Sequence, residues 1–106
     1  MEEINKDELK QKLDSDSDIA LIEVLDHNEY KKGHIQGAIN IPLAKIVSEA
    51  KKLFDKDREL ILYCSDYECS ASPTAGKKLE NAGFDNVYHY PGGKKEWKEA
   101  GYPMET

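Results

Sequence analysis

The sequence predicts an α/β domain built around a parallel sheet, and two observations lead to this fold class. Short, nearly unbroken apolar runs at 19–25 and 59–63 are typical of strands that are covered on both faces. Segments whose apolar residues recur at helical spacing alternate with such runs, and strands that alternate with helices form parallel sheets. At 106 residues the chain is long enough for one core and too short for a second, so we expect a single domain at 1–106.

Capping and breaking residues mark the boundaries of the elements in the first half of the chain. Asn5 followed by Glu8 forms a capping-box pattern. Asp26 can cap a short helical turn that Gly33 closes. Pro42 ends an edge strand, because proline cannot donate to a sheet ladder. The elements expected here are a helix at 6–14, a solvated turn at 14–18, a strand at 19–25, a helical turn around Tyr30, a strand at 38–42 and a helix at 44–53.

The second half of the chain is organised around the apolar run at 59–63 and the loop that follows it. Ser72 and Pro73 supply a hydroxyl N-cap and a proline at the first helical position, so we expect a helix to begin there. Gly83 stops that helix. The elements expected here are a strand at 59–63, a helix at 73–82, a strand at 85–90 and a final helix at 94–100 that can bury Trp97.

Cys64 stands at the carboxyl end of the 59–63 strand, and we interpret it as a catalytic nucleophile. In open α/β sheets, ligands bind beyond the carboxyl ends of the strands, and the free N–H groups of a helix N-terminus favour an anion. A thiolate is such an anion, and it is the nucleophilic form of cysteine. The rest of the loop, whose backbone N–H groups form the expected substrate-binding cradle, consists of Ser65, Asp66, Tyr67, Glu68, Cys69, Ser70 and Ala71.

Charge and composition exclude several classes of protein. The net charge of -6, without a basic patch, argues against binding to a nucleic-acid backbone. The acidic start of the chain does not resemble a signal peptide and no apolar run reaches bilayer length, so we expect a cytoplasmic protein without a membrane partner. In a reducing compartment, two cysteines five positions apart indicate redox, catalytic or metal-binding chemistry rather than a structural staple. The histidines lack ligand spacing to these cysteines, so we expect no metal and no other cofactor.

Two groups of motifs flank the Cys64 loop. The first comprises 21–24, Glu29 with Tyr30, and 33–42, and the second comprises 83–88, Gly92 with Gly93, Trp97, and 100–103. On these motifs the chain resembles a single-domain rhodanese over nearly its whole length, and Cys64 falls where that family has its catalytic cysteine. The resemblance implies a three-layer α/β/α fold with five parallel strands. It also implies that Cys64 takes a sulfur atom from a donor, holds it as a persulfide and passes it to a nucleophile.

The Cys64 loop departs from the pattern of thiosulfate-cleaving rhodaneses, whose shorter loop contains glycine and a closing arginine. Anchored on the helix start, the alignment puts Ala71 in the place of the arginine, whereas an alignment anchored on Cys64 puts Cys69 there. We prefer the helix anchor, because loops accept insertions more readily than helices. A further departure is the presence of Glu23 and Leu25, where the family often has aspartate and arginine.

Asp66 and Glu68 bring two negative charges close to the thiolate, and the loop contains no lysine or arginine. Nearby negative charges raise the pKa of a thiol and repel an anionic donor. We therefore expect weak turnover of thiosulfate. The expected donor is a persulfide or polysulfide, either free or carried by another protein, and the expected acceptor is a thiol. We expect the protein to act as a monomer.

Cys69 allows a second hypothesis, in which it serves as a resolving thiol. A cysteine within one loop of a reactive thiolate can attack a persulfide or sulfenate there and release sulfide or water. The competing interpretations are that Cys69 is a small loop residue without chemistry and that Cys64 is a buried structural cysteine.

Two other functions are compatible with the fold. The first function is a rhodanese-like binding or regulatory module without turnover, because a fold does not settle function. The second is a phosphatase or arsenate reductase, since cell-cycle tyrosine phosphatases share the fold, but the missing closing arginine argues against it.

We expect His34 to fix a turn through a hydrogen bond and His89 to lie half-buried at the surface.

Overall fold

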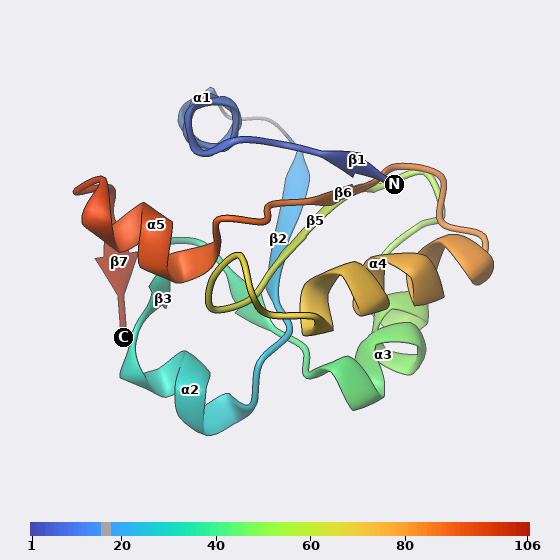
Figure 1. The fold of residues 1–106 in the computed structure, drawn as a ribbon. Helices are drawn as coiled ribbons and strands as arrows, with labels where there is room; N and C mark the ends of the chain where they lie inside the picture. Colours follow the sequence, from blue (N-terminus) through green and yellow to red (C-terminus); the bar gives the residue numbers. More distant parts are fainter. Residues whose placement is uncertain (16–17) are drawn as a thin grey trace.

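The computed structural model describes residues 1–15 and 18–106, so Asp16 and Ser17 of the expected solvated turn lie outside the described residues. Strands and helices alternate along the chain, as the apolar pattern indicates (Figure 1). The helices are α1 (Lys6–Asp14), α2 (His27–Lys32), the 3₁₀ helix η1 (Leu43–Lys45), α3 (Ile46–Leu53), α4 (Ala71–Asn81) and α5 (Gly93–Glu99). The strands are β1 (Glu2–Glu3), β2 (Ile19–Glu23), β3 (His34–Ile35), β4 (Ile39–Asn40), β5 (Glu59–Tyr63), β6 (Val87–His89) and β7 (Met104–Glu105).

The main sheet has the strand order β1-β6-β5-β2-β4, and each neighbouring pair is parallel. The predicted α/β class and the five-stranded parallel sheet are therefore confirmed. β2 and β5 lie next to each other inside the sheet, with Ile19 opposite Glu59 and Glu23 opposite Tyr63. The expected edge position of the 38–42 strand is also confirmed, because β4 ends the strand order beside β2.

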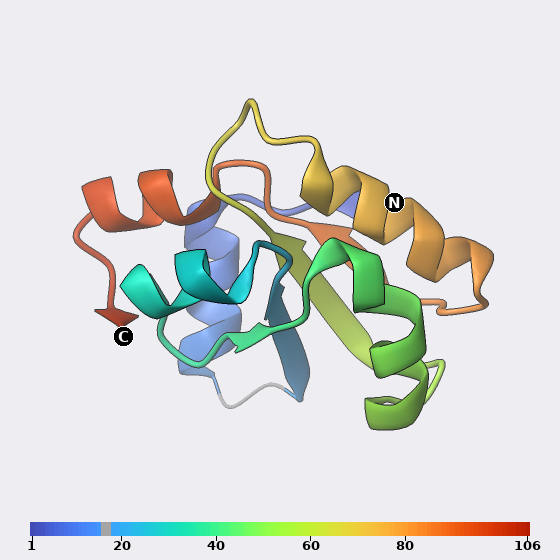
Figure 2. The ribbon, with the colours of Figure 1, turned by 90° about the horizontal axis from the view of Figure 1, so that it is seen from below.

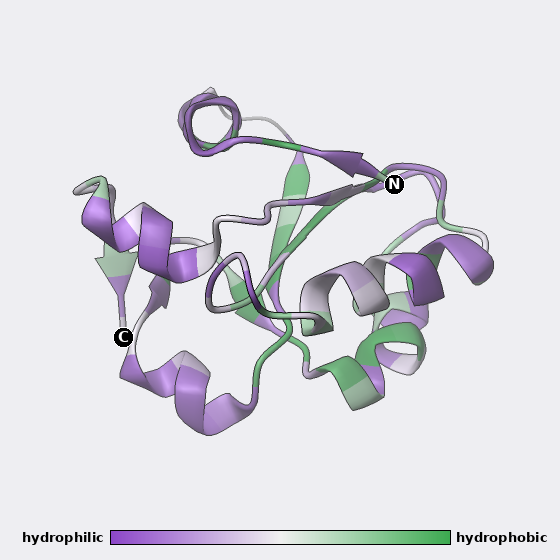
Figure 3. Cartoon of the chain, viewed as in Figure 1, coloured by the Kyte–Doolittle hydropathy of each residue, from purple (hydrophilic) through white to green (hydrophobic). Residues whose placement is uncertain are grey.

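Helices cover both faces of the sheet, which confirms the three-layer arrangement. Side chains alternate along β5, so Leu60 and Leu62 lie in the core beneath α3 and α4. Ile61 and Tyr63 point the other way, into the core beneath α1 and α5. Figure 1 shows these two pairs of helices on opposite sides of the sheet, and Figure 3 shows the apolar strands between them.

Two pairings at the margins of the fold are not predicted from the sequence. β1 consists of two exposed glutamates and is defined by its pairing with β6, where Glu3 lies opposite His89. β3 and β7 form a separate antiparallel pair, in which Ile35 lies opposite Met104. β1, β3 and β7 have no local apolar pattern that would mark them as strands, so each is defined only by a partner far along the chain.

The helix boundaries follow the capping signals in α1 and depart from them elsewhere. The predicted capping box is formed, since the Glu8 N–H donates to Asn5 Oδ1 at 2.8 Å and the Asn5 N–H donates to Glu8 Oε1 at 3.2 Å. Asp26 and Gly33 flank α2 as predicted, although the Asp26 side chain makes no capping bond. The helix expected at 44–53 begins with the 3₁₀ turn η1 before it continues as α3.

Helix α4 begins before the position that the sequence predicts. Its N-cap is Ser70 rather than Ser72, so that Ser72 and Pro73 lie inside the first turn. Proline is tolerated there, because the first N–H groups of a helix have no partner within it. The Ser72 side chain is fully buried and its hydroxyl faces Cys64. Within the described residues, no helix combines the length and apolar character needed to cross a membrane.

Replacement of Leu79 by alanine tests the assigned core. Leu79 is fully buried on α4, so Leu79→Ala should lower the free energy of unfolding by about 2–5 kcal/mol through the cavity it leaves. The control is Leu53→Ala on α3, where a 55% exposed side chain should cost less than about 0.5 kcal/mol. Urea unfolding followed by circular dichroism compares the two variants, and equal losses would contradict the core assignment.

Candidate active site

The carboxyl ends of β2, β5 and β6 meet at one edge of the sheet, where Cys64 directly follows β5. The Cys64 side chain is buried and belongs to the core beneath α3 and α4. Figure 2 shows the loop that follows Cys64 (yellow) extending beyond the end of β5, between α5 and α4. This edge is where ligands bind in parallel α/β sheets.

A disulfide joins Cys64 to Cys69, with 6.4 Å between their Cα atoms. A tight turn brings the two cysteines together. Within it, the Glu68 N–H donates to Asp66 Oδ1 at 3.0 Å and the Cys69 N–H donates to the Asp66 carbonyl at 3.2 Å. The arrangement of the loop thus allows the two sulfur atoms to react with each other.

Ser72 is a site residue that sequence reasoning missed. Its Oγ lies 3.5 Å from Cys64 Sγ, and both groups are buried. A hydroxyl in this position can donate a hydrogen bond to a thiolate, and such a bond favours the charged form of the sulfur. The signal in the sequence is a hydroxyl residue near a helix start, which equally indicates an N-cap.

The expected cradle of backbone N–H groups is partly used by the loop itself, because two of these groups bond to Asp66. The remaining N–H groups belong to a loop without a basic side chain, so an anion there would be held by the backbone alone. The exposed loop residues are Tyr67, Glu68 and Ser70, and the half-buried ones are Ser65, Asp66, Cys69 and Ala71.

Tyr67 connects the loop to α5 through Glu96. The Tyr67 hydroxyl donates to Glu96 Oε2 at 2.7 Å, and the Tyr90 hydroxyl donates to Glu96 Oε1 at 2.8 Å. The bond to the carboxylate raises the pKa of Tyr67, while burial and the same carboxylate raise the pKa of Tyr90. Glu96 therefore fixes the outer part of the loop.

Two hollows, of about 330 and 350 Å³, share Tyr67 and Glu96 in their walls. Lys95 lines the hollow of about 330 Å³, and none of the described lysines or arginines lines the other. The acidic residues in their walls are Glu3, Glu8, Asp66, Glu68, Glu96 and Glu99. This excess of carboxylates beside the loop disfavours a small anion as ligand.

The first turn of α5 packs directly on the backbone of the cysteine loop. The Lys94 N–H donates to the Cys64 carbonyl at 3.0 Å, and the Lys95 N–H donates to the Ser65 carbonyl at 2.9 Å. Gly93 has a φ of 68°, and a Cβ atom on it would lie 2.6 Å from the Cys64 carbonyl oxygen. Both the backbone conformation and the close approach therefore require glycine at this position.

His34 and His89 are both buried and contact neighbouring elements. His34 Nδ1 lies 3.0 Å from the Tyr30 carbonyl, to which it donates, and its ring stacks on Tyr30 with 3.7 Å between centroids. The predicted turn-fixing role of His34 is thus confirmed. The prediction that His89 lies half-buried at the surface is wrong, because β1 pairs beside it and leaves it 8% exposed. Burial lowers the pKa of His89, against the opposing charge of Glu3.

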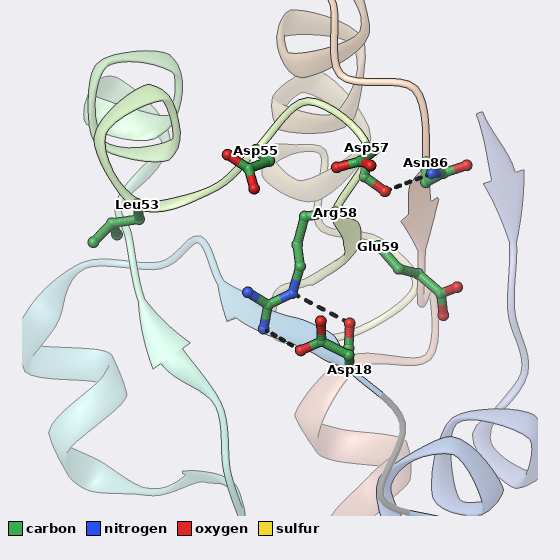
Figure 4. Close-up of a pocket in the computed structure, with 7 residues that line it drawn as sticks. All are labelled: Asp18, Leu53, Asp55, Asp57, Arg58, Glu59 and Asn86. Carbon is green, nitrogen blue, oxygen red and sulfur yellow. Dashed lines mark hydrogen bonds and ion pairs between the residues drawn. The ribbon is translucent and has the colours of Figure 1, made fainter.

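A larger hollow, of about 570 Å³, lies at the opposite edge of the sheet, where β5 begins (Figure 4). Arg58, the single arginine of the sequence, stands in its wall and pairs with Asp18, with 3.3 Å between Nη2 and Oδ1. The walls contain no cysteine or histidine. Across the described part of the chain, no group of three or more His, Cys, Asp or Glu side chains is arranged to hold a metal ion.

Comparison with known proteins connects this geometry to a family. Residues 5–100 match the family model described as the rhodanese-like domain. The chain is 35% identical over 85 residues to thiosulfate sulfurtransferase GlpE of Shewanella oneidensis, a match that covers 77% of this chain and 78% of the relative. The solution structure of the rhodanese-like domain of an Anabaena sp. protein superposes with a TM-score of 0.90 and 29% identity, over 99% of this chain and 79% of that one.

Two further relatives are longer than this chain. The putative sulfur carrier protein YrkF of Bacillus subtilis is 32% identical over 95 residues, which cover 90% of this chain and 50% of the relative. An HTH-type transcriptional regulator of Mycobacterium tuberculosis is 36% identical over 88 residues, which cover 83% of this chain and 38% of the relative. The chain thus spans half or less of the length of both.

Gly93→Ala tests the close packing of α5 on the loop. We expect the free energy of unfolding to fall by well over about 1 kcal/mol, because alanine would introduce both backbone strain and a clash with the Cys64 carbonyl. Gly101→Ala is the matched control, since Gly101 has a φ of 78° and open space where a Cβ atom would lie, so that strain alone should cost about 1 kcal/mol. Thermal unfolding compares the two, and a smaller loss at Gly93 would contradict the contact.

Proposed function

Because this chain belongs to the rhodanese-like domain family, we propose that it is a sulfurtransferase or sulfur carrier that forms a persulfide on Cys64. The observation that carries the proposal is the position of Cys64 at the carboxyl end of β5, beside the Ser72 hydroxyl and bonded to Cys69. We further propose that it works as a monomer in the cytoplasm, where the disulfide would be a transient form.

The proposed transfer uses the reduced form of the protein. The Cys64 thiolate attacks the sulfane sulfur of a persulfide or polysulfide, the bond from that sulfur to the donor breaks, and the donor leaves as a thiolate or a shortened polysulfide. Cys64 then carries one extra sulfur atom as a persulfide. An acceptor thiolate attacks the outer sulfur and leaves with it, which restores the Cys64 thiolate. Ser72 Oγ, 3.5 Å from Sγ, would donate to the sulfur when it is charged.

We propose Cys69 as the resolving thiol of the same loop. Its thiolate would attack the inner sulfur of the Cys64 persulfide, forming the Cys64–Cys69 disulfide and expelling the outer sulfur as hydrosulfide. A dithiol reductant would then reduce the disulfide and become a disulfide itself. The bond between the two cysteines supports this step, because it requires the same approach of the two sulfur atoms.

A binding or regulatory module without turnover is the second candidate function. The observation that favours it is the match to part of an HTH-type transcriptional regulator, in which a domain of this kind accompanies another. Uptake of sulfur by Cys64 separates the two candidates. A phosphatase or arsenate reductase is disfavoured, because the single arginine of the sequence lies at the opposite edge of the sheet and pairs with Asp18.

Treatment of the reduced protein with polysulfide tests the roles of the two cysteines. We expect Cys69→Ser to accumulate one extra sulfur atom on Cys64, whereas the wild type should lose the adduct quickly and release sulfide, because Cys69 resolves it. Intact mass and peptide mapping locate the sulfur, and Cys64→Ser serves as the control that takes up none at this site. Absence of an adduct on Cys64 in both the wild type and Cys69→Ser would contradict sulfur transfer and favour the binding module.

The acidic loop leads to a prediction about the donor. Transfer from thiosulfate to cyanide should be slow in the wild type, and Asp66→Asn with Glu68→Gln should raise it roughly fivefold, as expected when about 1 kcal/mol of repulsion is removed. Glu99→Gln is the control, because it removes an acid from the wall of the same hollow but not from the loop. Steady-state kinetics measure the rates, and no gain in the double variant would contradict the role assigned to the loop charges.

A further inference from the structure

A largely buried ion pair involves the residue whose N–H bonds to the Cys64 carbonyl, and the proposed chemistry does not use it. Lys94 Nζ is 3.2 Å from Glu23 Oε2, the Glu23 side chain is fully buried, and the Lys94 side chain is 15% exposed. Glu23 ends β2 and Lys94 lies in the first turn of α5, so the pair joins two elements that are far apart in the sequence. Burying two charges is costly unless their remaining hydrogen-bonding groups are satisfied.

The ammonium group of Lys94 is fully satisfied at this position. An ammonium has three donors, and here the three acceptors are Glu23 Oε2, the Glu29 carbonyl at 2.9 Å and the Gly33 carbonyl at 3.0 Å. The two carbonyls belong to α2 and to the residue that closes it. The side chain of Lys94 therefore anchors the start of α5 to both β2 and α2.

The other carboxylate oxygen of Glu23 holds the residue that precedes Cys64. The Tyr63 hydroxyl donates to Glu23 Oε1 at 2.9 Å and accepts from the Ile35 N–H at 3.1 Å. Burial, followed by the negative charge of Glu23, raises the pKa of Tyr63, so this hydroxyl stays protonated and remains a donor. Tyr63 is thereby fixed at the end of β5.

Cys64 is thus held from both sides by groups that converge on one carboxylate. Tyr63 directly precedes Cys64 and is hydrogen-bonded to Glu23. The Lys94 N–H donates to the Cys64 carbonyl at 3.0 Å, and the Lys94 side chain pairs with the same Glu23. We propose that Glu23 and Lys94 are positioning residues that fix the backbone of Cys64 for its reactions with donor sulfur and with Cys69. The role of these two residues in sulfur transfer rests on the proposed function. Their effect on disulfide formation between Cys64 and Cys69 does not depend on that function.

The double variant Glu23→Gln/Lys94→Met separates positioning from stability. Removing one partner would leave an unpaired buried charge, whereas replacing both by neutral side chains of similar length removes that penalty. We therefore expect a melting temperature close to that of the wild type. The anchor from α5 to β2 and α2 is nevertheless lost, so Cys64 should be less well placed to react.

The equilibrium of the Cys64–Cys69 disulfide in glutathione buffers measures this placement without any sulfur transfer. We expect the equilibrium constant for disulfide formation to fall roughly tenfold in the double variant, because loss of preorganisation lowers the effective concentration of the two thiols. Lys98→Met is the matched control, since Lys98 lies on the same helix with an exposed side chain that lines neither hollow beside the loop, and its constant should be unchanged.

An unchanged equilibrium constant in the folded double variant would overturn the proposal. If the double variant does not fold, Glu23→Gln alone is the second variant, because it keeps the side-chain shape and leaves the partly exposed Lys94 ammonium bonded to the Glu29 and Gly33 carbonyls. It should show the same change in weaker form, and an unchanged constant there would overturn the proposal as well. A parallel assay follows sulfur uptake on Cys64 from polysulfide. Failure of the wild type in that assay would overturn the proposed function, whereas a lowered disulfide constant in the variant would still support positioning.

Discussion

The parallel pairing of β5 with β2 on one side and β6 on the other is the constraint on which the candidate site depends. Parallel strands end at the same edge of the sheet, so the segments that follow them meet there. Glu23 from β2, Cys64 from β5 and the Gly93 turn beyond β6 are brought together in this way. The contacts between these segments are hydrogen bonds to the backbone carbonyls of Cys64 and Ser65 and the ion pair of Glu23 with Lys94.

Helices and strands could be predicted where apolar runs or capping residues in the same stretch of sequence mark their boundaries. The apolar run 59–63 followed by Cys64 predicted both the central strand and the candidate nucleophile, and Asn5 with Glu8 predicted the start of α1. β1 could not be predicted in this way, because its two glutamates acquire a strand conformation only beside β6. The buried state of His89 was missed for the same reason, since β1 pairs beside it.

Residues around Cys64 differ in how much of their role the sequence encodes. Both cysteines could be singled out from spacing and placement. Ser72 could not, because the hydroxyl that faces Cys64 carries the same sequence signal as a helix cap. Lys94 looks like one lysine among many on a surface helix, and its burial against Glu23 arises only when α5 packs on the ends of β2 and α2. Such roles come from tertiary contacts and leave no local pattern.

Both margins of the main sheet are short, and this has a consequence for how such a domain behaves beside other chains. β1 and β4 have two residues each, and β1 places two glutamates on its side of the sheet. Exposed strand edges invite pairing with foreign strands, and short or charged edges discourage it. A sheet bordered in this way can lie beside another chain without a foreign strand extending it.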